Sequence, residues 1–360
     1  MVAWPERTGT ASLIESANLL ALATASPPHV FEQTQVAAAV RMLFADRYRD
    51  FDRLSPIFQN AGIERRQATM PMEWYFEPRS WPERTQAYLA GGLDLFIDAA
   101  TLALKRGGLA AADVDAIVTV SSTGIATPSL EARAMARMGF RADVSRVPVF
   151  GLGCAGGVTG LAIAARLAVS RPGSVVLLVC VELCTLAVRL DTLTSANMVA
   201  MALFGDGAAA CLVSTGAKGL RTIEHSGEHT WPDTLGIMGW NVDPEGFGVI
   251  FDRSIPSFAA RHLSNAVNGI LGRMDLSLAD VDRFVCHPGG ARVVEALETA
   301  LDLADGTLDR EREVLADHGN MSAPTALFVL ERVLADPPQN RLMLSALGPG
   351  FTATCLSLTS

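Results

Sequence analysis

The sequence lacks an excess of positive charge, and this absence limits the partners that the protein can bind. The chain of 360 residues carries 29 Lys and Arg against 38 Asp and Glu, which gives a net charge of −9. Binding to nucleic acid needs a basic surface, so we exclude nucleic acid as a partner. A local basic patch for a small anionic ligand stays compatible with this charge.

Paired cysteine motifs are also absent. None of the cysteines forms a C-x-x-C pair, and the six are Cys154, Cys180, Cys184, Cys211, Cys286 and Cys355. Metal sites need clustered Cys and His at ligand spacing, so we expect no metal. Several cysteines stand in apolar runs such as VVLLVCVEL, a pattern typical of reduced, buried thiols in a cytoplasmic protein.

No basic region followed by a long apolar stretch stands at the amino terminus, where Glu6 and Glu15 lie. The run ANLLALATA, residues 17–25, is too short to span a membrane and is soon followed by two prolines. It predicts a buried strand. We therefore expect no signal peptide, no membrane span and a cytoplasmic location.

An internal repeat is the most informative feature that is present. Residues 109–118 read LAAADVDAIV and residues 276–285 read LSLADVDRFV, identical at six of ten positions. Each copy is followed by a glycine-rich helix start, a strand, a glycine turn and a second strand. We expect a duplicated α/β fold in layers, with halves at 1–220 and 221–360 that share one core.

Cys154 lies in GLGCAGG, where glycines permit a tight turn just ahead of a predicted helix. A thiol at a helix N-terminus meets the positive end of the helix dipole, which favours the thiolate. Cys154 is therefore a candidate nucleophile. A small residue packed in a tight turn would give the same string, and that alternative stays open.

Two more candidates lie in the second half. His287 ends the β-rich run VDRFVC, so it either projects into a cleft or is a hydrogen-bonded loop histidine. Asn320, in HGNMSAPT, stands at a predicted helix start, where spacing alone favours an N-cap. Cys154 and Asn320 occupy equivalent places in the repeat, so equivalent helix starts would bring them to one site.

Five strings together resemble the motif set of chalcone-synthase-like type III polyketide synthases: GCAGG, FGDGAAA, CHPGG, GNMSAPT and GPGFT. The resemblance runs from about residue 15 to the C-terminus. It implies a duplicated thiolase-like α/β fold with five layers in the order αβαβα. It also implies acyl-CoA and malonyl-CoA as substrates, no metal or redox cofactor, and a homodimer.

The resemblance implies roles for the three candidates. Cys154 would carry the starter acyl group as a thioester, and His287 would keep its thiolate ionised. His287 and Asn320 would donate hydrogen bonds to the malonyl thioester oxygen during decarboxylation, an interaction typically worth a few kcal/mol per donor.

The resemblance also implies the surroundings of the site. Phe204 would stand between the CoA tunnel and the cavity, with Val249 at a second gate position that is phenylalanine in relatives. The other implied pocket residues are Ser122, Thr123, Thr127, Cys184, Leu186, Ala187 and Ser322. Thr127 would lie near the dimer interface. Arg53 and Arg292 would bind CoA, with Arg65 and Arg66 as further candidates, because Pro56 and Asn60 replace basic residues of plant relatives.

The segment VSSTGIATPSLEARAMARMG resembles bacterial synthases of long-chain alkylpyrones or alkylresorcinols. Cys184 and Ala187 are less polar than the residues of plant relatives, so we expect a medium- or long-chain fatty acyl starter. Such a chain gains about 0.8 kcal/mol per methylene buried. A short-chain or aromatic starter stays open.

Two other functions remain as alternatives. A single-condensation β-ketoacyl synthase of the KAS III type shares Cys, His and Asn, although its histidine motif usually continues Gln-Ala-Asn rather than Pro-Gly-Gly. A non-catalytic thiolase-fold subunit would bind acyl chains or a partner, but such proteins usually lose the cysteine.

Overall fold

The computed structural model describes residues 16–46, 51–191 and 194–360. The expectation about a targeting segment at residues 1–15 lies outside the described residues. The remaining chain forms one nine-stranded mixed sheet and two small two-stranded sheets. The strand predicted at 17–25 is confirmed as β1 (Ala17–Ala25), which ends ahead of the two prolines.

Each half of the chain supplies one side of the large sheet. The first half forms the order β5-β4-β6-β7-β1, and the second half continues as β8-β13-β12-β11. The first-half strands are β4 (Ala116–Val120), β5 (Ser145–Val149), β6 (Val175–Leu183) and β7 (Asp206–Thr215). The second-half strands are β8 (Arg221–Thr230), β11 (Arg283–Cys286), β12 (Arg341–Gly348) and β13 (Thr352–Thr359). The sides meet at β1 and β8, which pair over only three residues.

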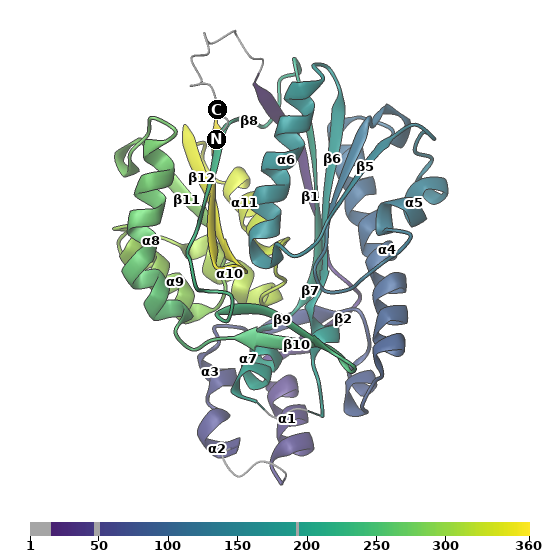
Figure 1. Cartoon of the computed structure of the whole chain (residues 1–360), viewed down its shortest axis with the longest axis vertical. Coiled ribbons are helices and arrows are strands. Elements are labelled where there is room, and N and C mark those ends of the chain that lie inside the picture. Colours follow the sequence, from purple (N-terminus) through teal and green to yellow (C-terminus); the bar gives the residue numbers. More distant parts are fainter. Residues whose placement is uncertain (1–15, 47–50, 192–193) are drawn as a thin grey trace, which may run out of the picture.

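The helices complete five layers, which confirms the expected αβαβα order (Figure 1). α4 (Trp81–Gly107) and α5 (Leu130–Met138) cover the outer face of the first side. α8 (Ile255–Gly272) and α9 (Ala291–Ala300) cover the outer face of the second side. α6 (Gly156–Ser170) and α11 (Thr325–Ala335) lie between the two sides and contact strands of both.

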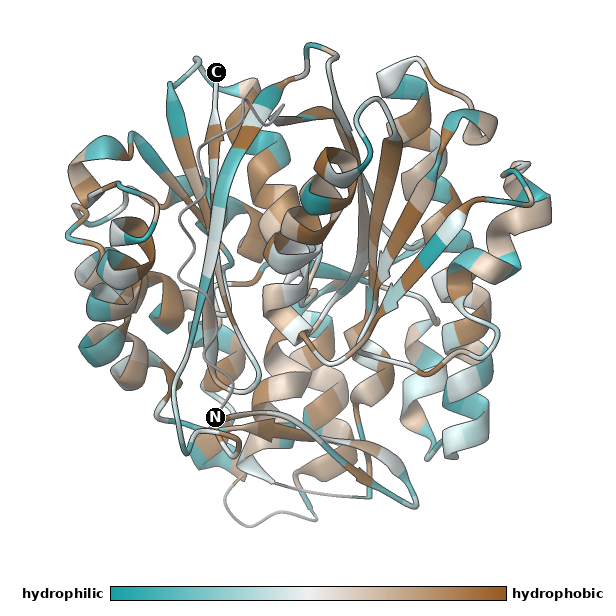
Figure 2. Cartoon of the chain, turned by 45° about the horizontal axis from the view of Figure 1, so that its top comes forward, coloured by the Kyte–Doolittle hydropathy of each residue, from teal (hydrophilic) through white to brown (hydrophobic). Residues whose placement is uncertain are grey.

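The central pair of helices is apolar because it is enclosed by sheet on both sides (Figure 2). α6 is built mainly of Ala, Gly, Leu and Val, and its central core cluster includes residues of both halves. By length and hydropathy alone, α4 and the segment 153–170 are long enough to cross a membrane. In this fold both pack against the sheet as core helices.

The repeated string LxxADVD has a physical reason. In each copy a short 3-10 turn precedes the strand: η2 (Ala111–Asp113) before β4 and η5 (Leu278–Asp280) before β11. The Asp113 carboxylate accepts a hydrogen bond from the Ala110 amide, and the Asp280 carboxylate accepts one from the Ser277 amide. The aspartate therefore closes the same turn twice.

Smaller elements surround the site. From the first half they are β2 (His29–Glu32), α1 (Gln33–Phe44), α2 (Phe51–Leu54), α3 (Ile57–Asn60), β3 (Arg65–Ala68), η1 (Met72–Phe76), η4 (Cys184–Ala187) and α7 (Ser195–Leu203). From the second half they are the hairpin β9 (Met238–Asp243) and β10 (Gly246–Phe251), and α10 (Asp309–His318). Among these elements, α1, α2, α3, α7 and the hairpin β9–β10 lie in the lower part of Figure 1.

Candidate active site

Cys154 lies in the short 3-10 turn η3 (Gly153–Ala155), immediately before α6. Gly153 has φ +49°, and a side chain there would come within 2.7 Å of the Pro349 ring, so only glycine fits. The Ser122 hydroxyl accepts hydrogen bonds from the amides of Gly151 (3.2 Å) and Gly153 (3.3 Å). The segment GLGCAGG, the Pro349 ring of the segment GPGFT and the Ser122 hydroxyl together fix the turn that carries the thiol.

Burial of the Cys154 thiol opposes the thiolate that the N-terminus of α6 would favour. The side chain is 8% exposed, and burial raises its pKa to about 12 despite a hydrogen bond with Ser322 that lowers it. The buried Glu182 carboxylate also raises this pKa. Desolvation of the charged form outweighs the helix dipole here, because the dipole is worth at most a few kcal/mol.

Asn320 is not an N-cap, which corrects the interpretation from spacing alone. The N-cap of α11 is Pro324, four residues later. The Asn320 Oδ1 instead accepts from the Ser322 amide (2.9 Å), and Ser322 takes φ +60° to make this contact. The Asn320 Nδ2 donates to the Gly289 carbonyl at 3.2 Å. A loop, rather than a helix end, therefore orients the carboxamide.

His287 directly follows β11, as the sequence predicts. Its amide donates to the Ser345 carbonyl on β12 at 2.9 Å, which fixes the backbone. Within the described residues neither ring nitrogen has a hydrogen-bond partner, and burial lowers the pKa of the imidazole to about 4. Burial therefore favours the neutral ring, and the thiolate–imidazolium pair implied by the resemblance stays a prediction.

A cavity of about 460 Å³, here called the thiol cavity, brings together seven predicted residues. They are Ser122, Cys154, Cys184, Phe204, Val249, Asn320 and Ser322. His287 lines a neighbouring cavity, which shares Met238, Phe251 and Asn320 with the thiol cavity. Asn320 therefore lines both the cavity that holds the thiol and the cavity that holds the imidazole.

The hairpin β9–β10 supplies a cavity wall of which the sequence reasoning predicted Val249 but missed Met238, Trp240 and Phe251. Trp240 and Val249 pair across the hairpin, and Phe251 and Met238 pair two residues away on the same face. All four line the thiol cavity. The Trp240 indole donates to the Ser122 carbonyl at 2.8 Å. The alternation of large apolar residues in MGW and VIF was the signal that would have found this wall.

Glu182 is a second residue that the sequence reasoning missed. Its carboxylate is fully buried and accepts from the amides of Ser122 and Thr123 and from the Thr123 hydroxyl (2.7 Å). Burial raises its pKa to about 8. This carboxyl group supports the segment that holds the thiol turn. An acidic residue within an apolar strand, VCVELC, was the available signal.

Four predicted pocket residues do not line the thiol cavity. The Thr123 hydroxyl is occupied by Glu182 and the Leu183 amide. Leu186 and Ala187 are buried, and Leu186 packs in the core beneath α4. Thr127 is exposed on the loop after β4. In the single chain, Thr123, Leu186 and Ala187 are therefore core residues, and Thr127 is a surface residue.

The predicted CoA residues Arg53 and Arg292 are both exposed, on α2 and at the start of α9. Gly62, after α3, is close to Ala291, so the ends of α3 and α9 meet. Arg66 does not fit as a phosphate ligand, because it is buried and hydrogen-bonded to backbone carbonyls. Arg65 forms an ion pair with Asp317.

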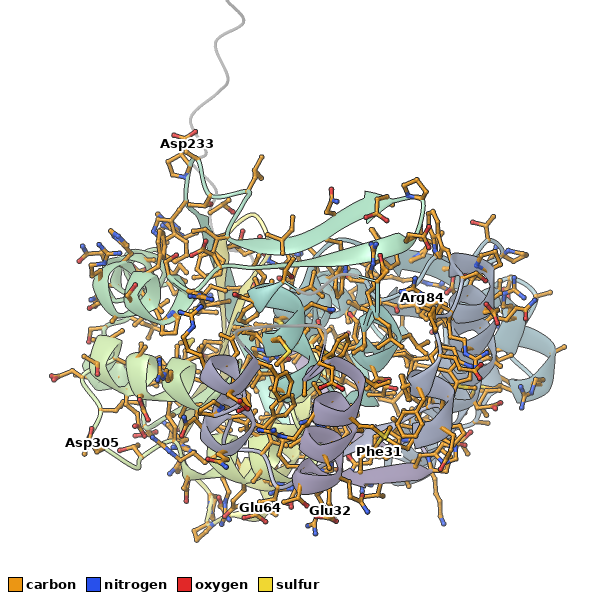
Figure 3. All side chains as sticks on the ribbon, turned by 90° about the horizontal axis from the view of Figure 1, so that it is seen from below. Phe31, Glu32, Glu64, Arg84, Asp233 and Asp305 are labelled. Atoms are coloured by element: carbon orange, nitrogen blue, oxygen red, sulfur yellow. The ribbon has the colours of Figure 1, made fainter. Side chains whose placement is uncertain are left out.

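A second apolar cavity of about 520 Å³, here called the α1 cavity, lies on the other side of Phe204. Its walls come from β2, α1, η1, η4 and α7, and Phe31 in this wall is labelled beside α1 in Figure 3. The apolar lining includes Phe31, Val36, Val40, Leu43, Phe76, Val188, Leu190 and Met201. Phe204 lines both cavities and separates them.

Comparison with known proteins identifies the class. The chain matches the family model for the N-terminal domain of chalcone and stilbene synthases over residues 7–217. It matches the model for their C-terminal domain over residues 222–360.

The chain is similar to individual members of this class. It is 39% identical over 344 residues to 1,3,6,8-tetrahydroxynaphthalene synthase of Streptomyces peucetius subsp. caesius, covering 93% of this chain and 91% of that protein. It is 29% identical over 313 residues to 3,5-dihydroxyphenylacetyl-CoA synthase of Amycolatopsis orientalis, covering 83% and 84%. The crystal structure of 1,3,6,8-tetrahydroxynaphthalene synthase from Streptomyces coelicolor A3(2) superposes with a TM-score of 0.90 at 26% identity, covering 95% and 99%.

Fold and comparisons together define a thiolase-like α/β acyltransferase that extends acyl chains. The chain belongs to the chalcone and stilbene synthase family, the type III polyketide synthases, which perform decarboxylative condensations with malonyl-CoA. The comparisons therefore favour this family over the two alternatives, a single-condensation β-ketoacyl synthase and a non-catalytic thiolase-fold subunit.

Proposed function

We propose that this synthase loads a medium- or long-chain fatty acyl starter on Cys154, extends it with malonyl-CoA and cyclises the product to an alkylpyrone or alkylresorcinol. The observation that carries the starter assignment is the pair of apolar cavities that meet at Phe204. The proposed division of labour places the nucleophile in residues 1–220 and His287 and Asn320 in residues 221–360.

In the loading step the Cys154 sulfur attacks the acyl-CoA thioester carbonyl. The thiol proton passes to the neutral His287 ring, and the CoA thiolate leaves and takes up that proton. The ring nitrogens of His287, which have no hydrogen-bond partner within the described residues, support this role because one of them is available to accept the thiol proton.

In the extension step malonyl-CoA loses CO₂, and the electrons of the broken C–C bond move to the thioester oxygen as an enolate. His287 and Asn320 Nδ2 donate hydrogen bonds to that oxygen, each worth a few kcal/mol in a water-excluded site. The enolate carbon then attacks the Cys154 thioester, and the Cys154 thiolate is the leaving group.

The alkyl chain of the starter fits the apolar walls beside the thiol. The thiol cavity is bounded by Phe204, Trp240 and Phe251, and the α1 cavity behind Phe204 adds a second apolar volume. Burial of each methylene in such surroundings contributes about 0.8 kcal/mol. A rotation of the Phe204 ring would join the two volumes and admit a longer chain.

The proposed entrance for CoA lies where the ends of α3 and α9 meet, with Arg53, on the preceding helix α2, and Arg292 as phosphate contacts. We also propose a cytoplasmic homodimer. β5 is an edge strand of the large sheet, and Ile125 and Phe150, which follow the adjacent ends of β4 and β5, are both more than half exposed. Thr127 lies on the same loop as Ile125, so a partner chain would cover it.

A second candidate function comes from the relatives. Both named products, a tetrahydroxynaphthalene and a dihydroxyphenylacetyl-CoA, carry no alkyl chain. A synthase of this kind would build its ring without a fatty starter. In that case the α1 cavity would have no role in starter binding.

A product assay separates the two functions. Purified protein would receive malonyl-CoA alone or with acyl-CoA starters from acetyl to stearoyl, and mass spectrometry would identify the products. Alkylpyrones or alkylresorcinols, formed best from long starters, are the expected result. An unsubstituted polyhydroxylated ring from malonyl-CoA alone would favour the second candidate and contradict the fatty starter.

Two variants control this assay. Cys154→Ala should abolish all products, because no thioester forms. Cys211→Ala, which removes a buried thiol of β7 outside the cavities, should leave the product pattern unchanged.

A further inference from the structure

Arg66 is a buried cation whose guanidinium group donates hydrogen bonds to backbone carbonyls. It lies on β3 and is only 2% exposed. Its Nη1 donates to the carbonyls of Met201 (2.8 Å) and Phe204 (3.0 Å), and its Nη2 donates to the carbonyl of Ala202 (2.7 Å). Nη2 also donates to the Gln33 side-chain oxygen. These carbonyls lie at the C-terminus of α7, where a helix has no donors of its own left.

The one carbonyl in this run that Arg66 does not bind is taken by Asn320. The Asn320 amide donates to the Leu203 carbonyl at 2.8 Å, and the Gly205 amide donates to the Asn320 carbonyl at 3.1 Å. Of the carbonyls of residues 201–204, Arg66 thus binds three and the Asn320 amide binds the fourth, that of Leu203. The turn after α7, the loop at Asn320 and β3 form one hydrogen-bonded unit.

Close packing leaves this unit little freedom. A side chain at Gly319 would come within 2.7 Å of the Leu203 carbonyl oxygen, and one at Gly205 within 2.1 Å of the His318 carbonyl oxygen. A side chain at either glycine would also meet the Cβ of Arg66, at 3.4 Å from Gly205 and 3.7 Å from Gly319. The backbone of Arg66 is therefore packed close to both segments, and its guanidinium is hydrogen-bonded to the turn after α7.

We propose that Arg66 is a positioning residue for the condensation reaction, which sets the Phe204 ring and the Asn320 carboxamide relative to each other. The proposal rests on the roles proposed above for Phe204 and Asn320. It does not depend on the identity of the starter, because the hydrogen bonds of Arg66 go to backbone carbonyls and to the Gln33 side chain.

The choice of arginine follows from the geometry. Three carbonyls and one side-chain oxygen surround one group, and only the planar guanidinium has enough donors in a fixed fork to bind them all. A lysine ammonium has three donors on one atom and no fork. The positive charge also faces the negative end of the α7 dipole. Burial lowers the pKa of Arg66 to about 9, so the group stays charged at neutral pH.

A second buried charge, that of Asp206, connects this hydrogen-bonded unit to η4, next to the thiol cavity. Asp206 is fully buried, and its charge raises the pKa of Arg66. The Asp206 carboxylate accepts from the Thr185 amide (2.8 Å) and the Thr185 hydroxyl (2.7 Å) on η4. η4 carries Cys184, which lines the thiol cavity. Arg66 is therefore linked to three segments of the cavity wall.

The test measures two partial reactions of the full-length enzyme. Loading of an acyl group on Cys154 is followed by intact-protein mass, and decarboxylation of malonyl-CoA is followed by release of labelled CO₂. In Arg66→Lys we expect loading within about twofold of wild type. We expect kcat for decarboxylation to fall about tenfold or more, because small displacements of catalytic groups are costly. The range of starters accepted should broaden as the Phe204 ring is released.

Arg221→Lys is the matched control. Arg221 is also buried, at 7% exposed, and it also donates to backbone carbonyls, those of Gln339 and Asn340, on β8 outside the cavities. It should lose thermal stability to a similar extent but retain the wild-type ratio of decarboxylation to loading per folded molecule.

Two outcomes would overturn the proposal. One is an unchanged decarboxylation rate and starter range in Arg66→Lys. The other is a parallel fall of loading and decarboxylation that Arg221→Lys shares. If Arg66→Lys does not fold, Gln33→Met removes one acceptor of the guanidinium and should shift the same ratio in the same direction by a smaller factor. An unchanged ratio in Gln33→Met would then count against the proposal.

Discussion

Phe204 and Asn320 are joined by a parallel backbone bridge, although they lie 116 residues apart and in different halves of the chain. The hydrogen bonds of this bridge link the residue that separates the two apolar cavities to Asn320, which lines both the thiol and imidazole cavities. The roles proposed for Phe204 in chain selection and for Asn320 in malonyl binding would therefore share one piece of backbone. A change at either residue is expected to affect both.

Phe204→Leu should widen the connection between the thiol cavity and the α1 cavity. The T-shaped contact with Trp240, at 6.4 Å between ring centroids, is lost, and leucine fills less of the opening. We expect the product profile to shift by several methylenes toward longer starters, measured by mass spectrometry. Phe96→Leu, a similar loss of volume in the core beneath the sheet, should lower stability without changing chain length. An identical profile in both variants would contradict the gating role.

Alkylation of Cys154 by iodoacetamide should speed up about tenfold per pH unit between pH 6 and 9. Burial holds the pKa of the thiol near 12, so the thiolate fraction is small and rises throughout this range. Ser322→Ala should slow alkylation further, because the hydrogen bond from Ser322 lowers that pKa. Peptide mass spectrometry measures the rate at Cys154. A plateau below pH 7 that disappears in His287→Ala would instead show a preformed thiolate–imidazolium pair.

Ser122→Ala should lower kcat by about tenfold with little change in KM. The hydroxyl accepts from the amides of Gly151 and Gly153, and without it the thiol turn loses two contacts that fix it. Ser121→Ala is the matched control, since the neighbouring hydroxyl bonds instead to Tyr88 at 2.9 Å. It should cost about 1 kcal/mol of stability and leave kcat unchanged. Equal kinetic losses in both variants would contradict the assignment.

Asp243→Asn should loosen the hairpin β9–β10 over the thiol cavity. Arg189, which follows η4, donates to both oxygens of Asp243 at 2.9 and 2.8 Å. Arg84, labelled in Figure 3, donates to the Glu245 carbonyl at the same hairpin turn. We expect a broader starter range and a higher KM for acyl-CoA in steady-state assays. Asp336→Asn, which breaks a comparable pair with Arg310, should change neither. A starter range that stays unchanged would exclude this hairpin from substrate selection.

The repeat made most of the fold predictable. Two matching strings placed the strand starts at β4 and β11, and the equivalent glycine-rich segments placed Cys154 and Asn320 in one cavity. Periodicity reports which face of an element is buried, and this is the information that a layered fold mainly depends on.

The details of the site were less predictable, because they depend on tertiary burial. The helix N-terminus at Cys154 suggested a thiolate, but desolvation raises the thiol pKa instead. Asn320 had the spacing of an N-cap, yet the loop folds so that its carboxamide binds Ser322 and Gly289. Arg66 resembled a surface phosphate ligand, whereas β3 places it beneath α7. Local sequence does not show which side chains a distant segment will cover.

The most direct test of the central claim is to identify the acyl group that forms on Cys154 in competition. The enzyme would be mixed with equal amounts of acetyl-, hexanoyl-, decanoyl- and stearoyl-CoA plus malonyl-CoA, quenched in acid and digested, and the Cys154 peptide analysed by mass spectrometry. We predict that the peptide carries mainly the decanoyl or stearoyl group and that Cys154→Ala carries none. A peptide that carries only acetyl or malonyl-derived groups would contradict the fatty acyl starter, and acylation at another residue would contradict the role of Cys154.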